Sequence, residues 1–152
     1  MADLFALDAS VYIAAFREAR ALAELKAFRQ RVGLRLVMSG IVAMELAAGA
    51  VTDEHDAAVR SLVEPYAARG AVLPVSAESC RQAGRVLAAL ARHERMALDS
   101  ARRSLTNDVL IATSCCEAGA MLVTNNTRDF AAIQRHLRGF RFAARWPLST
   151  MR

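Results

Sequence analysis

Short apolar runs, separated by helix-like segments, dominate the hydrophobic pattern of the chain. Such runs predict strands, because a strand buried on both faces of a parallel sheet has few polar positions. We expect five strands, at 4–7, 34–38, 71–75, 121–124 and 140–142. Pro74 lies in the third run and indicates an edge strand, since proline cannot donate to a sheet ladder.

Apolar residues at three- and four-residue steps predict helices between these runs. The expected helices span 11–30, 41–48, 53–69, 77–93, 108–118 and 129–136. Side chains that precede these segments are expected as N-caps: Ser10, Asp53, Ser76, and Thr106 or Asn107. Pro65 is expected to kink or split its helix. The polar stretch 96–105 is expected to be a loop that borders the functional site.

Strands that alternate with helices predict βαβ units and a parallel sheet covered on both faces. The expected fold class is therefore α/β, a three-layer α/β/α domain with a central parallel sheet of four to five strands. The 152 residues are enough for one core, and no repeat or linker divides them, so we expect a single domain over 1–152.

The composition argues against a disulfide-rich, secreted or membrane-spanning protein. The three cysteines show no CxxC spacing, and two of them are adjacent, so a disulfide framework is not expected. The N-terminus carries Asp3 and no basic region typical of a signal peptide, and no apolar run approaches the roughly 20 residues of a membrane span. We expect a soluble, cytoplasmic protein without a membrane partner.

Arginine is concentrated in two parts of the chain, which has a net charge of +5. One set precedes Asp108 and the other lies beyond residue 127: Arg81, Arg85, Arg92, Arg95, Arg102 and Arg103, then Arg128, Arg135, Arg138, Arg141, Arg145 and Arg152. Arginines near an acidic crevice suit a polyanion such as nucleic acid. A solvated basic face, or a dock for an acidic protein, accounts for the charge equally well.

Four acids stand in unusual surroundings. Asp8 ends the first apolar strand, at the edge where open α/β sheets place their ligands. Glu45 is the only charge in the apolar helix 41–48, where an unpaired carboxylate costs several kcal/mol or shifts its pKa. Asp108 opens a largely apolar helix, and Asp129 follows the fourth strand.

Three of these acids could also have a purely structural role. Asp108 would favour the dipole of its helix, Asp129 could be a helix cap, and Glu45 could pair with a buried arginine. Together, however, acids converging at one edge of a parallel sheet would repel one another unless a cation joined them. Oxygen ligands without a histidine or cysteine set select Mg²⁺ or Mn²⁺. Such sites bind phosphates, which suits phosphodiester hydrolysis.

Four segments resemble the motifs of the PIN-domain family, and specifically of VapC-type toxin ribonucleases. They occur in the family's order along nearly the whole chain: Leu7-Asp8-Ala9-Ser10, the stretch 39–49 with Glu45-Leu46, Asn107-Asp108-Val109-Leu110-Ile111-Ala112, and the stretch 122–130 with Asn126 and Asp129-Phe130. Ala9 departs from the polar residue that many members carry. Some relatives hold an acid at the position of Asn126, so Asp129 is the weakest of the matches.

The resemblance implies a metal-dependent endoribonuclease that leaves a 5′-phosphate and a 3′-hydroxyl. It implies that Asp8, Glu45 and Asp108 hold Mg²⁺ or Mn²⁺, with Asp129 helping directly or through water. Supporting and RNA-contacting residues are also implied: Ser10, Thr124 and Asn126 would orient ligands or water, and Arg102, Arg103 and Arg128 would contact phosphates. The implied partners are an RNA substrate, a VapB-like antitoxin and a second copy of the chain.

Two other classes remain as alternatives. A HAD-like phosphatase also begins with an aspartate after an apolar strand. That class needs a second acid where this chain has Ser10. It also needs a catalytic lysine, and the only lysine here is Lys26, within the first predicted helix. The second alternative is a catalytically weak or inactive PIN-like module that binds RNA or protein. The presence of Asp8, Glu45 and Asp108 together argues against it.

Overall fold

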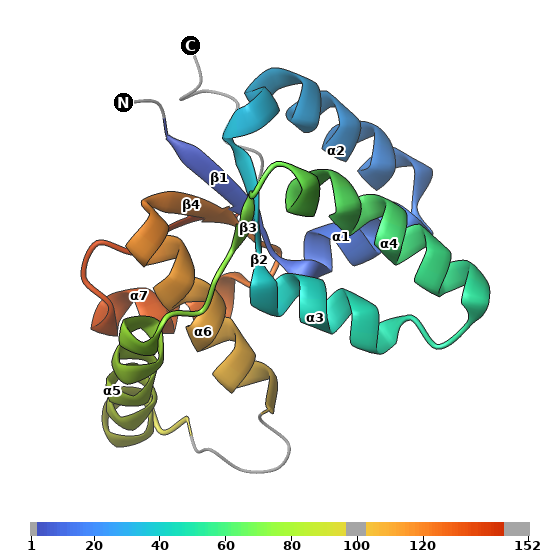
Figure 1. The fold of residues 1–152 in the computed structure, drawn as a ribbon. Coiled ribbons are helices and arrows are strands. Elements are labelled where there is room, and N and C mark those ends of the chain that lie inside the picture. Colours follow the sequence, from blue (N-terminus) through green and yellow to red (C-terminus); the bar gives the residue numbers. More distant parts are fainter. Residues whose placement is uncertain (1–2, 97–102, 145–152) are drawn as a thin grey trace.

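A parallel sheet lies at the centre of the structure, a computed structural model that describes residues 3–96 and 103–144 (Figure 1). The described residues contain five strands, in the spatial order β3-β2-β1-β4-β5. They are β1 (Leu4–Leu7), β2 (Leu36–Ser39), β3 (Val72–Leu73), β4 (Ala120–Val123) and β5 (Arg141–Ala143). Every pairing is parallel. β3 is an edge strand, as predicted, but it ends before Pro74, whereas the expected strand 71–75 included this proline.

The helices of the described residues are α1 (Ala9–Arg17), α2 (Ala19–Val32), α3 (Gly40–Gly49), α4 (Asp53–Ala68), α5 (Ala77–His93), α6 (Arg103–Ala118) and α7 (Thr127–His136), with a 3₁₀ turn at Gly33–Arg35. Figure 1 shows α1, α2 and α4 to one side of the sheet and α5, α6 and α7 to the other. Right-handed crossovers require this division, because the chain moves outward from β1 to β3 and then returns past β1 to β4. The predicted three-layer α/β/α class is confirmed.

The order of the strands creates a switch point between β1 and β4. The chain leaves β1 toward β2 and leaves β4 in the opposite direction, toward β5. In open α/β sheets a crevice forms at such a point, beyond the carboxyl ends of the two strands. Asp8 and Thr124 are the first residues after these strands, so both lie at this crevice.

The expected single helix over 11–30 is wrong. Glu18 adopts an extended conformation, with φ −130° and ψ 124°, and separates α1 from α2. A helix of 20 residues would be about 30 Å long, whereas strands of four residues span roughly 13 Å. Two shorter helices fit over so short a sheet, and each buries its own apolar residues, among them Tyr12 in α1 and Phe28 in α2.

Three further expectations about helices need correction. The helix containing Pro65 is not split, since α4 continues to Ala68, and the kink stays a prediction. The helix expected at 108–118 begins earlier, at Arg103, because Leu105 adds another buried contact. Part of the expected loop 96–105 is thus helical, and residues 97–102 lie outside the described residues. No helix in the described part of the chain is long and apolar enough to cross a bilayer.

Several predicted caps also differ. Ser76 caps α5 as predicted, with its Oγ accepting from the N–H of Ser79 at 2.9 Å. Asp8 rather than Ser10 caps α1, and Thr52 rather than Asp53 caps α4. The cap expected at Thr106 or Asn107 is wrong because both residues lie inside α6. Polar residues lie close together in these places, so sequence spacing alone could not select the capping residue.

Candidate active site

Asp8 is held at the carboxyl end of β1 by hydrogen bonds to both its side chain and its backbone. Its Oδ1 accepts from the N–H of Ala9 at 2.9 Å, and its Oδ2 accepts from Ser10 Oγ at 3.1 Å and Thr124 Oγ1 at 2.8 Å. The backbone N–H of Asp8 donates to the carbonyl of Val123 at 2.9 Å, which ties the residue to β4. With only 5% of its surface exposed, Asp8 has a fixed position at the switch point.

The three donors to the Asp8 carboxylate are a backbone amide and two hydroxyls, all of them neutral. They orient the oxygens without cancelling the negative charge. Thr124 Oγ1 also accepts from the N–H of Asn126 at 2.9 Å, which links Asp8 to the turn after β4. The turn that begins at Thr124 and the strand that ends before Asp8 are therefore fixed relative to each other.

Glu45 projects from α3 and is half-buried. Its Oε1 accepts from the side-chain amide of Asn107, on α6, at 3.0 Å. Burial raises the pKa of Glu45, and the charge of Asp8 raises it further, while the hydrogen bond from Asn107 opposes them. Among the described side chains Glu45 forms no ion pair, so the buried arginine partner considered from the sequence is not found there.

Asp108 lies in α6 and has 7% of its surface exposed. Burial raises its pKa to about 8, with further contributions from the charges of Asp8, Glu45 and Asp129. The side-chain amide of Asn126 donates to Asp108 Oδ2 and to Asp129 Oδ2, at 3.2 Å each, so one amide bridges the two acids. Asn126 also caps α7, with its Oδ1 accepting from the N–H of Asp129 at 3.4 Å.

The structure thus brings the four predicted acids into electrostatic contact, through four different elements of the fold. A divalent cation suits the chemistry of this donor set, because the ligands are all oxygen and burial with mutual repulsion is strong enough to protonate Asp108 near neutral pH. Within the described residues, however, no three Asp, Glu, His or Cys side chains already stand close enough to hold one ion. Their oxygens instead point toward neutral hydroxyls and amides.

Asn107 is the residue whose contact sequence reasoning missed. The sequence suggested a helix cap, whereas its amide lies inside α6 and holds Glu45, 62 positions away in the chain. Its position next to Asp108 was the available signal, since neighbouring residues on the first turns of a helix can both face one crevice. An amide in a polar stretch carries no charge that would mark it as unusual.

The predicted RNA-contacting arginines have different outcomes. Arg128 is exposed in the first turn of α7, one residue before Asp129. Arg103 is the first residue of α6, and only its backbone is described. Arg102 lies outside the described residues. The exposed position of Arg128 is compatible with a phosphate contact, and the assignment of all three stays a prediction.

Comparison with known families identifies the class of protein. The PIN domain family matches residues 5–135, which span all four acids and most of the chain. This chain therefore belongs to the PIN domain family, as its sequence motifs indicated. No curated protein matches it.

Chains in solved VapBC and FitAB structures share this fold. A chain in the crystal structure of DNA-bound VapBC from Salmonella typhimurium is 25% identical, with a TM-score of 0.70 over 93% of this chain and 98% of that one. A chain of VapBC-1 from nontypeable Haemophilus influenzae is 23% identical, with a TM-score of 0.66 over 92% and 96%. A chain of FitAB bound to an IR36 DNA fragment is 16% identical, with a TM-score of 0.64 over 92% and 94%.

Proposed function

We propose that this protein is a Mg²⁺- or Mn²⁺-dependent endoribonuclease, the VapC-type toxin of a toxin–antitoxin pair. One observation carries the proposal: Asp8, Glu45 and Asp108 converge at the switch point of the sheet, where burial and neighbouring charges raise the pKa of Asp108 to about 8. Among the described side chains only neutral donors stabilise these buried acids, so this part of the site is short of positive charge. Membership of the PIN domain family and the similarity to VapBC chains support the proposal.

In this proposal Asp8, Glu45 and Asp108 are the metal ligands, and Asp129 helps directly or through water. A bound Mg²⁺ or Mn²⁺ supplies the positive charge that polarises a water molecule and the phosphodiester. The carboxylates would hold this ion at the crevice between β1 and β4. Because they come from four separate elements, the folded chain, rather than any local segment, creates the site.

Neutral side chains around the acids act as positioning residues. Ser10 and Thr124 hold one oxygen of Asp8, while Asn107 holds one oxygen of Glu45. Asn126 holds Asp108 and Asp129 together. Hydroxyls and amides fix the orientation of the carboxylates and preserve their negative charge, which an arginine or lysine in the same places would cancel.

The proposed partners follow from the charge of the chain and from its structural matches. An RNA strand is the substrate, with Arg102, Arg103 and Arg128 as contacts to its phosphates. A VapB-like antitoxin is the protein partner, because the matching chains come from VapBC and FitAB complexes. A homodimer is proposed as the oligomeric state, and light scattering of the purified protein measures it.

Cleavage of total RNA by the purified protein tests the proposal. We expect cleavage with Mg²⁺ or Mn²⁺, none with EDTA, and a loss of at least about 100-fold in the variants Asp8→Asn and Asp108→Asn. Circular dichroism must show that both variants keep the fold. Cleavage that survives EDTA or both substitutions contradicts the proposed mechanism. RNA binding without any cleavage would instead favour the PIN-like binding module.

A further inference from the structure

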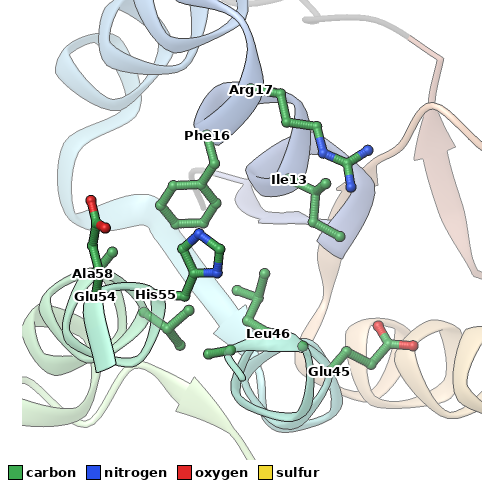
Figure 2. Close-up of a pocket in the computed structure, with 11 residues that line it drawn as sticks. Ile13, Phe16, Arg17, Glu45, Leu46, Glu54, His55 and Ala58 are labelled. Carbon is green, nitrogen blue, oxygen red and sulfur yellow. The ribbon is translucent and has the colours of Figure 1, made fainter. Parts of the chain in front are cut away.

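A pocket of about 490 Å³ opens beside the acidic site, between α1, α3 and α4 (Figure 2). Its size falls within the range of small-ligand sites, roughly 300–1,000 Å³. Figure 2 shows Phe16 entering from α1 and His55 from α4, with Leu46 of α3 below them. None of these residues takes part in the arrangement of acids described above.

The apolar part of the pocket presents an aromatic ring to solvent. Phe16 has 52% of its surface exposed and Ile13 has 39%, although both belong to a helix that buries other apolar residues. Burying a side chain of this size gains about 1.5–3 kcal/mol, so an exposed ring in a pocket forgoes stability that folding could have used. Tyr12 and Tyr66 fix the walls, because their hydroxyls lie 3.0 Å apart and join α1 to α4.

Polar groups at the rim include a donor, an acceptor and a group that can be either. Arg17 can only donate, a carboxylate at Glu54 can only accept, and a neutral imidazole at His55 has one nitrogen of each kind. This mixture does not match a phosphate, which carries only acceptors and negative charge. It does match the edge of a nucleobase, which carries donors and acceptors side by side.

Glu45 connects the pocket with the acidic site. Its side chain forms part of the pocket wall, while its carboxylate points away from Phe16 and His55 (Figure 2) and accepts from Asn107. A group in the pocket is therefore separated from the proposed metal ligands by the length of one side chain. A nucleotide next to the reacting phosphodiester lies at that distance.

We infer that this pocket binds one unstacked nucleobase of the RNA substrate, next to the scissile phosphodiester, with Phe16 as its stacking platform. The inference rests on the proposed ribonuclease function and adds to it a subsite for the base. Single-stranded RNA is recognised by stacking bases on aromatic rings and by hydrogen bonds to their edges, and the pocket offers both.

Stacking can be separated from general apolar contact by the choice of residue at position 16. Phe16→Leu keeps an apolar side chain and removes the aromatic face, whereas Phe16→Trp keeps an aromatic face. Leu22→Ala is the matched control, because Leu22 is also an exposed apolar residue, with 39% of its surface exposed, and lies on α2 outside the pocket. All are made in an Asp8→Asn background with Mg²⁺, so that binding is measured without cleavage.

The probes are fluorescent single-stranded oligo(A), oligo(C), oligo(G) and oligo(U), together with an abasic ribose-phosphate oligomer of the same length and charge. We expect the Asp8→Asn parent to prefer at least one base-bearing oligomer over the abasic one. Phe16→Leu should weaken that binding by about 5- to 150-fold and leave abasic binding unchanged. Phe16→Trp and Leu22→Ala should retain the preference of the parent.

The outcomes separate this inference from the proposed function. If the wild-type protein cleaves RNA but Phe16→Leu keeps the full preference for bases, the pocket is not a base subsite and the ribonuclease proposal stands. If the Phe16 variants weaken only a complex with the protein partner, the pocket belongs to that partner and the inference is likewise wrong. If the wild-type protein neither cleaves nor binds RNA, the proposed function fails and the inference fails with it.

Discussion

Two carboxylates of this protein have opposite electrostatic surroundings. Asp108 lies among other acids, and burial together with their charges raises its pKa to about 8. Glu94 follows α5 and accepts from Arg135 Nε at 2.7 Å and Arg135 Nη2 at 2.8 Å. The hydrogen bond from Arg135 is the main reason that the pKa of Glu94 falls to about 2, and His136, with Nε2 at 3.2 Å, adds to it.

The comparison separates a carboxylate that is paired with a cationic side chain from a carboxylate without such a partner among the described side chains. Glu94 joins the end of α5 to the end of α7, and its charge is matched inside the chain. Among the described side chains, Asp108 has only neutral donors and other carboxylates around it, so its charge calls for a cation from outside that set. We expect removal of the charge to have opposite effects at the two positions.

The largest expected effect comes from Asp108→Asn. Cleavage of RNA should fall at least about 100-fold, because a proposed metal ligand is lost. Without metal at pH 8.5, the same change should raise the free energy of unfolding by several kcal/mol, since it removes a charge that burial and repulsion destabilise. Urea unfolding in EDTA measures this gain. A metal-free variant less stable than the wild type would contradict the assignment of Asp108 as an unmatched charge.

The next effect concerns the amides that orient the acids. Asn107→Ala and Asn126→Ala should each weaken the binding of Mn²⁺ by about 10- to 100-fold, because Glu45 and Asp108 lose the partner that fixes them. Asn125→Ala is the control, since Asn125 is exposed and adjacent to Asn126. Equal Mn²⁺ affinity in all three variants would show that these amides serve only the fold.

A smaller effect concerns the pH dependence of stability in the metal-free protein. The folded-state pKa of Asp108 lies above its unfolded value, so the folded state holds the proton more tightly. The stabilisation that comes from this proton is fully present below about pH 4. This contribution is lost as pH rises from about 4 through 8. Unfolding of the wild type and Asp108→Asn across this range measures the difference, and curves that stay parallel would refute the assignment.

The smallest effect is expected for Glu94→Gln. The folded-state pKa of Glu94 lies below its unfolded value, so its ion pairs stabilise the protein above about pH 4.5, and this contribution is lost as pH falls toward 2. We expect a small decrease in melting temperature at pH 7, as is usual for partly exposed ion pairs, and unchanged RNA cleavage. A large loss of cleavage would mean that the ion pairs between α5 and α7 control the site.

Sequence reasoning located the elements of the fold better than their ends. Buried strands are easy to recognise, because an uninterrupted run of four apolar residues is rare on the surface of a protein, and β1 was predicted with its observed bounds. The break at Glu18 could not be seen, because apolar residues continue at helical spacing through Phe16 and Leu22, which the structure exposes. That spacing reflects a surface of the protein rather than its core.

The acids of the site could be predicted for a similar physical reason. Glu45 is a charge within an apolar helix and Asp8 ends a buried strand, so both contradict their surroundings in a way that the sequence displays. Their neutral partners fit their local sequence and are therefore not conspicuous in it. The contact from Asn107 to Glu45 depends on how α6 packs beside α3, and no local pattern in the sequence contains that information.

Calorimetric titration of Mn²⁺ into the wild type, Asp108→Asn and Glu94→Gln tests the central claim most directly. The claim is that the four acids at the switch point between β1 and β4 bind a divalent cation from solution. It predicts that the wild type and Glu94→Gln bind Mn²⁺ with equal affinity, and that Asp108→Asn binds it at least about 100-fold more weakly. Absence of binding to the wild type, or equal binding to all three proteins, would contradict the claim.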